Sequence, residues 1–269
     1  MRAASEASAI PGVRTVRDGD IATVILDNPA KRNALTVAMW REFAGAMRAL
    51  SAEEDLRCIV VRGAGDRAFA AGADIAEFAV LRDNAAQGKV YHRELVCGAL
   101  DAVAECRHPT VAMIHGACAG GGLEIACQCD LRIAGRSARF GVPINRLGFA
   151  IAYDELAALL PVAGRAVLRE LLLEGRVWDA REAWEKKLLT RVVDDARLEA
   201  EAYAAARRIA QGAPLVARWH KQMMRRLTPQ APALTAAEID ANFDYFDTED
   251  YRIGYDAFMA KRKPNFTGK

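Results

Sequence analysis

One stretch decides the fold of this chain: His108-Pro109-Thr110-Val111-Ala112-Met113-Ile114-His115-Gly116-Ala117-Cys118-Ala119-Gly120-Gly121-Gly122-Leu123-Glu124-Ile125-Ala126. Its apolar segment, residues 110–114, is typical of a short buried strand. Three glycines follow in a loop of small residues, and the apolar residues after them predict a helix with Glu124 at its start. Glycine lets a ligand approach the backbone. The free N–H groups of such a helix start can therefore face developing negative charge, with a carboxylate beside them.

The composition is that of a globular protein with one large core. Hydrophobic residues make up 52% of the 269 residues, which is ample for such a core. Charged residues make up 27% but nearly cancel to +2, so we expect no nucleic-acid binding through bulk charge. No run of about 18 apolar residues predicts a membrane-spanning helix. Residues 1–12 lack the apolar core of a signal peptide, so we expect a cytoplasmic protein.

The cysteines do not follow a metal-binding or disulfide pattern. No CxxC pair occurs, and no histidine cluster accompanies the thiols. We therefore expect reduced, buried thiols and no metal site. The six cysteines are Cys58, Cys97, Cys106, Cys118, Cys127 and Cys129.

Apolar spacing predicts alternating strands and helices up to about residue 197 and helices alone after it. Thr36 is a candidate cap for the first helix, whose apolar stripe runs from Leu35 to Leu50. Between Asp74 and Glu105 we expect two helices, with breaks near Asp83-Asn84 and at Gly88. Further strands are expected at 21–26, 58–61, 68–74, 130–134, 138–141 and 190–193, and further helices at 154–159, 164–174, 180–187, 199–212, 214–227, 234–246 and 248–261.

Four motifs in this order resemble the enoyl-CoA hydratase/isomerase (crotonase) superfamily, and the resemblance covers nearly the whole chain. The glycine stretch, continued to Asp130, is the third of them. The other three are Asn28-Pro29-Ala30-Lys31-Arg32-Asn33-Ala34-Leu35, Ala68-Phe69-Ala70-Ala71-Gly72-Ala73-Asp74-Ile75, and Phe258-Met259-Ala260-Lys261-Arg262-Lys263-Pro264-Asn265-Phe266.

The resemblance implies an α/β fold, a crotonase-type spiral of repeated ββα units with a C-terminal all-helical trimerisation region. We expect the spiral core, with the CoA and catalytic site, over residues 12–197 and the helical oligomerisation region over 198–269. It also implies an acyl-CoA thioester substrate, no cofactor beyond the coenzyme A of that substrate, and a homotrimer or a dimer of trimers.

By position, the backbone N–H groups of Ala73 and Gly121 would form the oxyanion hole of this family, and Glu124 would be the principal acid/base. Small residues suit places where the backbone must reach the substrate. The resemblance places CoA contacts at Lys31, Ala71, Phe258 and Lys261. Neighbouring positions complete the expected substrate site: Gly72, Asp74, Ile75 and Gly120. Asp74 also fits the role of a helix cap.

The sequence departs from the family at the second catalytic glutamate. Hydratases of this family carry it directly after a proline, and here Ile144 follows Pro143. Isoleucine transfers no proton, so Asp154 or Glu155 is the candidate replacement, at the start of a later helix. An ordinary helix start with Asp154 as the N-cap is the alternative. Ile144 and Tyr153 are expected to line the substrate pocket.

We therefore expect a lyase that hydrates a 2-enoyl-CoA through a stabilised enolate. Because the second glutamate is missing, isomerisation, decarboxylation or thioester hydrolysis on the same fold are alternatives. Isomerases of the family commonly keep the second glutamate and lose the first, which is the opposite pattern. The alternative to an enzyme is a binding protein of the same fold, which would bind acyl-CoA or RNA without turnover.

Overall fold

The computed structural model describes residues 10–228 and 234–267. The prediction that no signal peptide is present concerns residues 1–12, and residues 1–9 lie outside the described part. The strands are β1 (Gly12–Asp18), β2 (Ile21–Asp27), β3 (Cys58–Gly63), β4 (Ala68–Ala70), β5 (Thr110–Ile114), β6 (Ala117–Ala119), β7 (Leu131–Gly135), β8 (Arg139–Gly141), β9 (Trp178–Asp179) and β10 (Arg191–Val193). The α-helices are α1 (Val37–Ala52), α2 (Phe78–Leu81), α3 (Ala85–Val90), α4 (Cys97–Ala104), α5 (Gly121–Gln128), α6 (Tyr153–Glu174), α7 (Ala180–Glu185), α8 (Asp195–Ala210), α9 (Pro214–Leu227), α10 (Ala236–Ala241) and α11 (Glu249–Met259).

The strands form two sheets whose order follows a ββα repeat. The larger sheet runs β1-β2-β3-β5-β7-β10 and is parallel except for β1, while the smaller runs β4-β6-β8-β9. In the first unit, β1-β2-α1, both strands belong to the larger sheet. In the later units the first strand joins the larger sheet, the second joins the smaller one, and a helix follows, as in β5-β6-α5 and β7-β8-α6. This confirms the expected crotonase-type spiral. The division at 197/198 and the trimer stay predictions.

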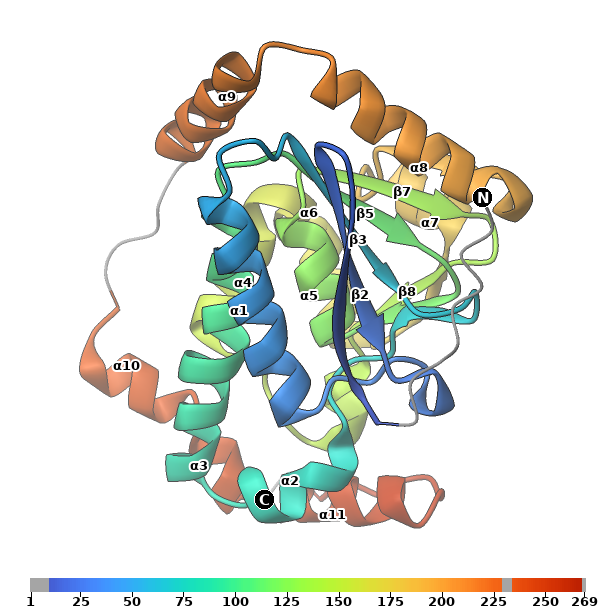
Figure 1. Ribbon diagram of the computed structural model, residues 1–269. Coiled ribbons are helices and arrows are strands. Elements are labelled where there is room, and N and C mark those ends of the chain that lie inside the picture. The colour runs from blue at the N-terminus through green and yellow to red at the C-terminus, as the bar shows by residue number, and fades with distance from the viewer. Residues whose placement is uncertain (1–9, 229–233, 268–269) are drawn as a thin grey trace.

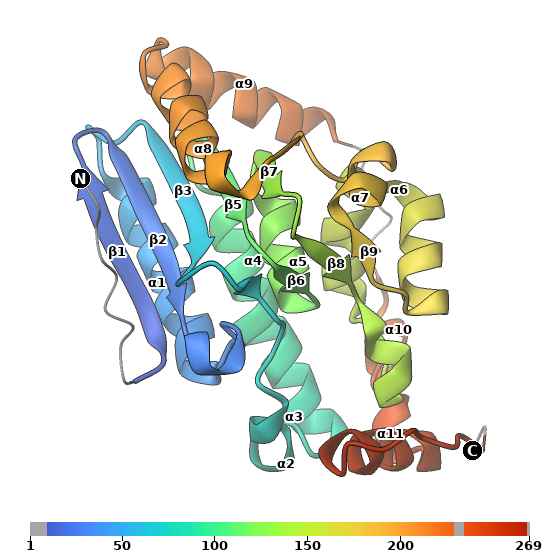
Figure 2. The same cartoon turned by 90° about the vertical axis from the view of Figure 1, so that its right-hand side faces the viewer.

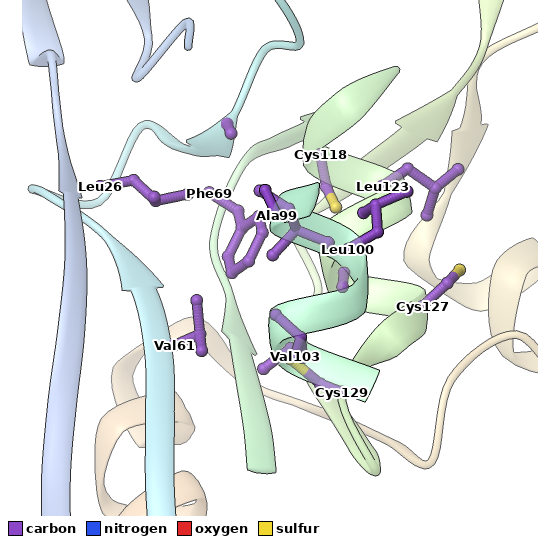
Figure 3. Packing of buried hydrophobic residues seen from close by; sticks show 14 of the residues in the cluster. Leu26, Val61, Phe69, Ala99, Leu100, Val103, Cys118, Leu123, Cys127 and Cys129 are labelled. Atoms are coloured by element: carbon purple, nitrogen blue, oxygen red, sulfur yellow. The ribbon is translucent and has the colours of Figure 1, made fainter. Parts of the chain in front are cut away.

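Alternate residues of the larger sheet pack on two different helical layers. In β3, Ile59 and Val61 face the core formed with α1, α4 and α5, whereas Cys58 and Val60 face α8 on the other side. Figure 1 shows α8 on one face of the sheet and α1, α4 and α5 on the other. Because both faces are covered, the central strands are mostly apolar. Figure 3 shows how the first core continues from Val61 to the buried thiols of Cys118, Cys127 and Cys129.

The first helix follows its sequence pattern. Its stripe residues Met39, Phe43 and Met47 are fully buried, and the Thr36 hydroxyl accepts a hydrogen bond from the Met39 N–H. The cap expected at Thr36 is therefore confirmed.

The break expected at Gly88 is wrong, because α3 continues through this residue. The ring of Phe246 packs directly against it, and a Cβ atom there would lie 2.2 Å from Phe246 Cε2. The glycine therefore permits a close helix contact. The break at Asp83-Asn84 is confirmed, since Asn84 caps α3 by accepting the Gln87 N–H. The helices expected at 154–159 and 164–174 join in α6, which bends at Gly164.

The C-terminal helices reach both ends of the molecule. Helix α8 packs on the larger sheet, whereas α10 and α11 lie near α2 and α3 at the opposite end (Figure 2). The single helix expected over 234–246 is wrong, because α10 ends at Ala241 and a 3₁₀ turn follows over Asp244–Asp247. Asn242 lies between them. It accepts the Tyr153 N–H at 2.9 Å and donates to the Ile151 carbonyl at 3.1 Å, so it holds the start of α6.

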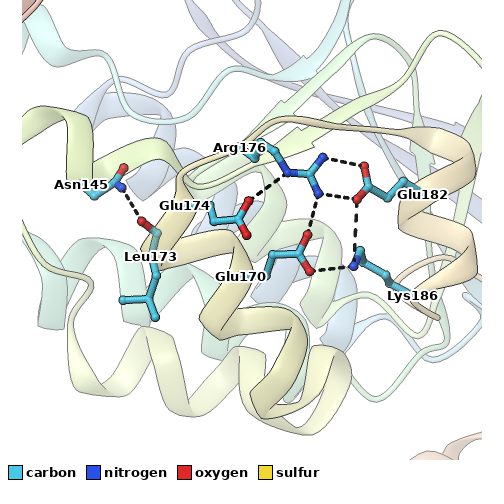
Figure 4. A network of polar contacts seen from close by, with 7 residues as sticks. All are labelled: Asn145, Glu170, Leu173, Glu174, Arg176, Glu182 and Lys186. Atoms are coloured by element: carbon cyan, nitrogen blue, oxygen red, sulfur yellow. Dashed lines mark hydrogen bonds and ion pairs between the residues drawn. The ribbon is translucent and has the colours of Figure 1, made fainter.

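A polar network holds the other end of α6. Arg176 pairs with Glu170, Glu174 and Glu182, and Lys186 pairs with Glu170 (Figure 4). Close by, the Asn145 amide donates to the Leu173 carbonyl at 3.0 Å. The 3₁₀ turn η4 (Pro143–Leu147) is thereby attached to α6, which matters because both border the cavity described below. Within the described residues, no helix is long and apolar enough to cross a bilayer.

Candidate active site

The glycine loop delivers a backbone N–H group to a cavity. Gly121 is the first residue of α5, where an N–H group has no acceptor within the helix. A Cβ atom at Gly121 would lie 2.6 Å from Trp40 Cζ2, and one at Gly122 would lie 2.4 Å from the Ala70 carbonyl oxygen. Close packing of α5 therefore requires glycine at both positions.

Ala73 supplies a second N–H group from a neighbouring loop. The Leu35 N–H donates to the Gly72 carbonyl, and the Asp74 N–H donates to the Leu35 carbonyl, both at 2.8 Å. In this parallel bridge the N–H of Ala73 points away from Leu35. Gly72 approaches the other loop closely, because a Cβ atom there would lie 3.2 Å from the Ala119 carbonyl oxygen. Ala73 and Gly121 both line the cavity, so the two loops border the same ligand space.

The cavity measures about 470 Å³ and its wall is mostly apolar. Many of the residues that the sequence predicts for the site line this cavity. They are Ala71, Gly72, Ala73, Ile75, Gly120, Gly121, Glu124, Ile144, Glu155 and Phe258. The aromatic side chains in its wall are Trp40, Phe78, Tyr91, Phe149 and Phe258. A long, largely apolar ligand with one polar head fits such a wall.

Two carboxyl groups from different helices reach this cavity. Glu124 comes from the first turn of α5 and Glu155 from the first turn of α6, and the side chains are 5% and 3% exposed. Burial, and then the nearby Glu155, raises the pKa of Glu124 well above its ordinary value. Burial also raises the pKa of Glu155 to about 8, against the opposing effect of the Arg82 charge. The value for Glu155 is that of a group that can exchange protons near neutral pH.

A model of the enoyl-CoA hydratase/isomerase family matches residues 17–269. The chain belongs to this family. A probable enoyl-CoA hydratase from Rhizobium meliloti is 36% identical over 254 residues, which cover 92% of this chain and 95% of that protein. A solved enoyl-CoA hydratase/carnithine racemase from Magnetospirillum magneticum has 49% identity and a TM-score of 0.79, with 96% of each chain covered. The protein is thus a crotonase-family acyl-CoA enzyme.

Another solved member of the family carries a different activity in its name. It is a methylmalonyl-CoA decarboxylase in complex with 2-nitronate-propionyl-CoA, with 27% identity and a TM-score of 0.86, covering 96% of this chain and 98% of its own. Family membership therefore sets the fold and the acyl-CoA chemistry, but it leaves the reaction to be argued from the site.

Two buried polar residues of the cavity wall, Arg82 and His92, were not predicted from the sequence. Nδ1 of His92 is hydrogen-bonded to Oε1 of Glu155, and Arg82 lies in the wall nearby. Burial, and then the Arg82 charge, lowers the pKa of His92 well below its ordinary value. His92 belongs to a π-helical turn, Tyr91–Val96, a feature frequent at functional sites. The sequence signal for His92 was weak: a polar residue next to Tyr91 in an otherwise apolar helix stripe.

Several predicted site residues lie outside the cavity wall. The Lys31 ammonium pairs with Asp74 at 2.6 Å, and the Asp74 carboxylate also accepts the Ala76 N–H, as a helix cap does. Tyr153 is 41% exposed and is absent from the wall. Lys261 is also exposed and absent from it, while its neighbour Arg262 is in it.

Asp154 and Glu155 are separated by the rotation of α6. The side chain of Asp154 is 48% exposed and faces Arg93 at 4.0 Å, whereas Glu155 is turned into the cavity. The alternative in which Asp154 caps this helix is wrong. Ala152 is the N-cap residue, and Asn242 accepts the Tyr153 N–H in place of a local side chain.

Proposed function

We propose that this enzyme hydrates a 2-enoyl-CoA, with Glu124 and Glu155 as its acid–base pair. One observation carries the proposal: two buried carboxyl groups border the same apolar cavity as two backbone N–H groups that can bind an oxyanion. Glu155 thereby takes the task of the glutamate that Ile144 replaces. In this proposal the enzyme requires no metal or further cofactor.

The residues divide the reaction as follows. The N–H groups of Ala73 and Gly121 hold the thioester oxygen and stabilise the enolate that forms when water adds to the β-carbon. One glutamate, ionised, accepts the proton that this water gives up. The other, protonated, donates its proton to the α-carbon as the carbonyl re-forms. Hydration thus leaves the first glutamate protonated and the second ionised, and transfer of one proton from the first to the second restores the starting state. Raised pKa values suit groups that exchange a proton in this way.

The adenosine and phosphate part of CoA requires cations at the cavity mouth. Arg146 and Arg262 border the cavity and are exposed, and Phe258 offers an apolar contact beside them. Lys31 stays a proposed phosphate contact, because its side chain is 53% exposed although it pairs with Asp74. We also keep the homotrimer or dimer of trimers as a proposal, and the cytoplasm as the expected compartment.

The test is to mix the pure protein with a short 2-enoyl-CoA and follow the ultraviolet absorbance of the conjugated thioester. Hydration removes this absorbance, and mass spectrometry then shows the gain of one water. Glu124→Gln should abolish the change. Tight binding without any turnover across a panel of enoyl-CoA thioesters would contradict the proposal and favour a binding protein.

Decarboxylation is the second candidate, because the decarboxylase neighbour has a TM-score of 0.86. The same oxyanion hole would stabilise the enolate left when carbon dioxide departs. Methylmalonyl-CoA in the same mass-spectrometric assay distinguishes the reactions. Loss of carbon dioxide from it, without hydration of any enoyl-CoA, would replace the first proposal by the second.

A further inference from the structure

The cavity contains a buried arginine without a counter-ion. Arg82 is 2% exposed, and its guanidinium carbon lies 4.5 Å and 4.3 Å from the ring centres of Phe78 and Phe149. Its Nη2 donates to the Tyr245 hydroxyl at 2.7 Å. In the described part of the chain, no carboxylate oxygen lies within 4.0 Å of its nitrogens, and its Nε has no acceptor.

The aromatic rings compensate only part of the cost of burying this charge. Contact with aromatic rings stabilises a desolvated cation. Removing the ion from water costs more than such contacts usually return, even after the protein relaxes. A guanidinium stays charged throughout the pH range in which proteins fold. The arrangement therefore leaves a positive charge that an anion would balance.

Neither carboxyl group of the acid–base pair forms an ion pair with Arg82, and no other carboxylate among the described residues does so. Glu124 and Glu155 have raised pKa values, so their neutral forms are favoured, and the lowered pKa of His92 favours a neutral ring. Tyr91 and Tyr245 lie in the same region, and burial raises the pKa of both hydroxyl groups, which keeps them neutral. Even with one glutamate of the pair ionised for catalysis, the Arg82 guanidinium has no carboxylate within 4.0 Å among the described residues.

A second unpartnered polar atom lies in the same wall. His92 uses Nδ1 for its bond to Glu155, and its Nε2 is buried without a partner among the described residues. When the proton of this pair is on Glu155, it is donated to Nδ1, and Nε2 then carries the imidazole proton. The wall therefore holds two kinds of donor, a guanidinium and an imidazole N–H.

We propose that the acyl group of the substrate carries a carboxylate, which Arg82 and His92 Nε2 bind inside the cavity. This inference rests on the proposed function and narrows its substrate class to CoA monothioesters of dicarboxylic acids. The CoA phosphates are the other anions of the ligand, but they are bulky and strongly hydrated. The exposed Arg146 and Arg262 suit them, whereas a nearly inaccessible guanidinium suits a small anion on the buried end of the ligand.

Calorimetric titration at pH 7 with two saturated ligands tests the inference. Glutaryl-CoA and pentanoyl-CoA have the same five-carbon chain and differ in the terminal carboxylate. We expect glutaryl-CoA to bind at least about tenfold more tightly, as a charge-assisted contact in a buried site implies. In Arg82→Met this preference should disappear, while pentanoyl-CoA affinity stays within about twofold, because methionine can occupy the aromatic surroundings.

Equal binding of the two ligands by the native protein would overturn the inference, as would an Arg82→Met variant that weakens both alike. If the variant fails to fold, the native protein decides with a third ligand, the terminal amide of glutaryl-CoA. A preference for the acid over this neutral amide supports recognition of charge, and its absence refutes it. Saturated thioesters cannot be hydrated, so these results do not depend on turnover. An enzyme that prefers glutaryl-CoA yet hydrates no enoyl-CoA would refute the proposed function alone.

Discussion

Nδ1 of His92 is hydrogen-bonded to Oε1 of Glu155 across 63 residues of sequence. The histidine comes from a π-helical turn and the glutamate from the first turn of α6, and both side chains are almost wholly buried. The bond aligns the carboxyl group within the cavity. The cavity therefore has a second carboxyl group, that of Glu155, although Ile144 stands where hydratases of the family have their second glutamate.

Replacing Glu124 by glutamine should lower kcat for hydration about 100- to 10,000-fold, because the amide neither accepts nor donates the required proton. Glutamine has the same size, and the native carboxyl is favoured in its neutral form, so the fold should be retained. Thioester absorbance gives the rate, and the melting temperature serves as the control. A variant with more than about a tenth of native kcat would remove Glu124 from the acid–base pair.

Neighbouring residues on α6 offer a matched comparison. Glu155→Gln should reduce kcat about 100-fold or more, whereas Asp154→Asn should leave it within about twofold, because only Glu155 faces the cavity. Both substitutions exchange a carboxylate for an amide at one helix start. If Asp154→Asn lost activity and Glu155→Gln kept it, the assignment of roles on this helix would be wrong.

The hydration rate should depend on pH through the second carboxyl. The reaction needs one ionised glutamate, and the pKa of Glu155 is raised to about 8. Below this pH the neutral form predominates, so kcat should increase as the pH rises from about 6 to about 9. Stopped-flow measurements across this range provide the profile. A profile that is flat, or falls with rising pH, would contradict an acid–base role for the raised carboxyl.

The same shift predicts an effect on stability. Glu155 holds its proton to about pH 8 when folded, whereas its ordinary value is 4.5. Between these values the folded state binds more protons than the unfolded state, so the free energy of unfolding should fall as the pH rises. Glu155→Gln removes this contribution. Urea unfolding should show the stability of the variant relative to the native protein increasing between about pH 5 and pH 8, and a constant difference would refute the shift.

Two glycine-to-alanine changes separate close packing from helix propensity. Gly121→Ala forces a methyl group against the buried Trp40 ring, so it should cost about 1–3 kcal/mol of stability and, by moving the N–H donor, lower kcat about 100- to 1,000-fold. Gly45 is exposed on α1 with open space around it. Gly45→Ala should therefore stabilise the protein by about 0.5–1 kcal/mol without changing kcat. Equal effects in the two variants would contradict the packing argument.

Elements with strong local patterns were predictable. Strands covered on both faces, such as β3 and β5, contain continuous apolar runs over residues 58–61 and 111–114, and α1 begins at a recognisable cap, Thr36. Strand β1 was not predicted, because it is an edge strand whose second half is exposed and carries charges. The helix expected over 234–246 was wrong because α10 ends at Ala241, and Asn242 after it uses its side chain to bond the distant start of α6.

By itself, the sequence determined the alternation of strands and helices and the glycine loop that ends at Glu124, because each depends on residues that are close together in the chain. The spiral of ββα units was expected only from the resemblance of four motifs to a known family. The tertiary structure alone decided that Glu155 rather than Asp154 enters the cavity, and that His92 and Arg82 surround it. These contacts join α6 to segments more than 60 residues away, and which side of a helix faces a cavity depends on how it packs. Neither the spacing nor the type of residues in the sequence predicts which face of α6 packs against the cavity.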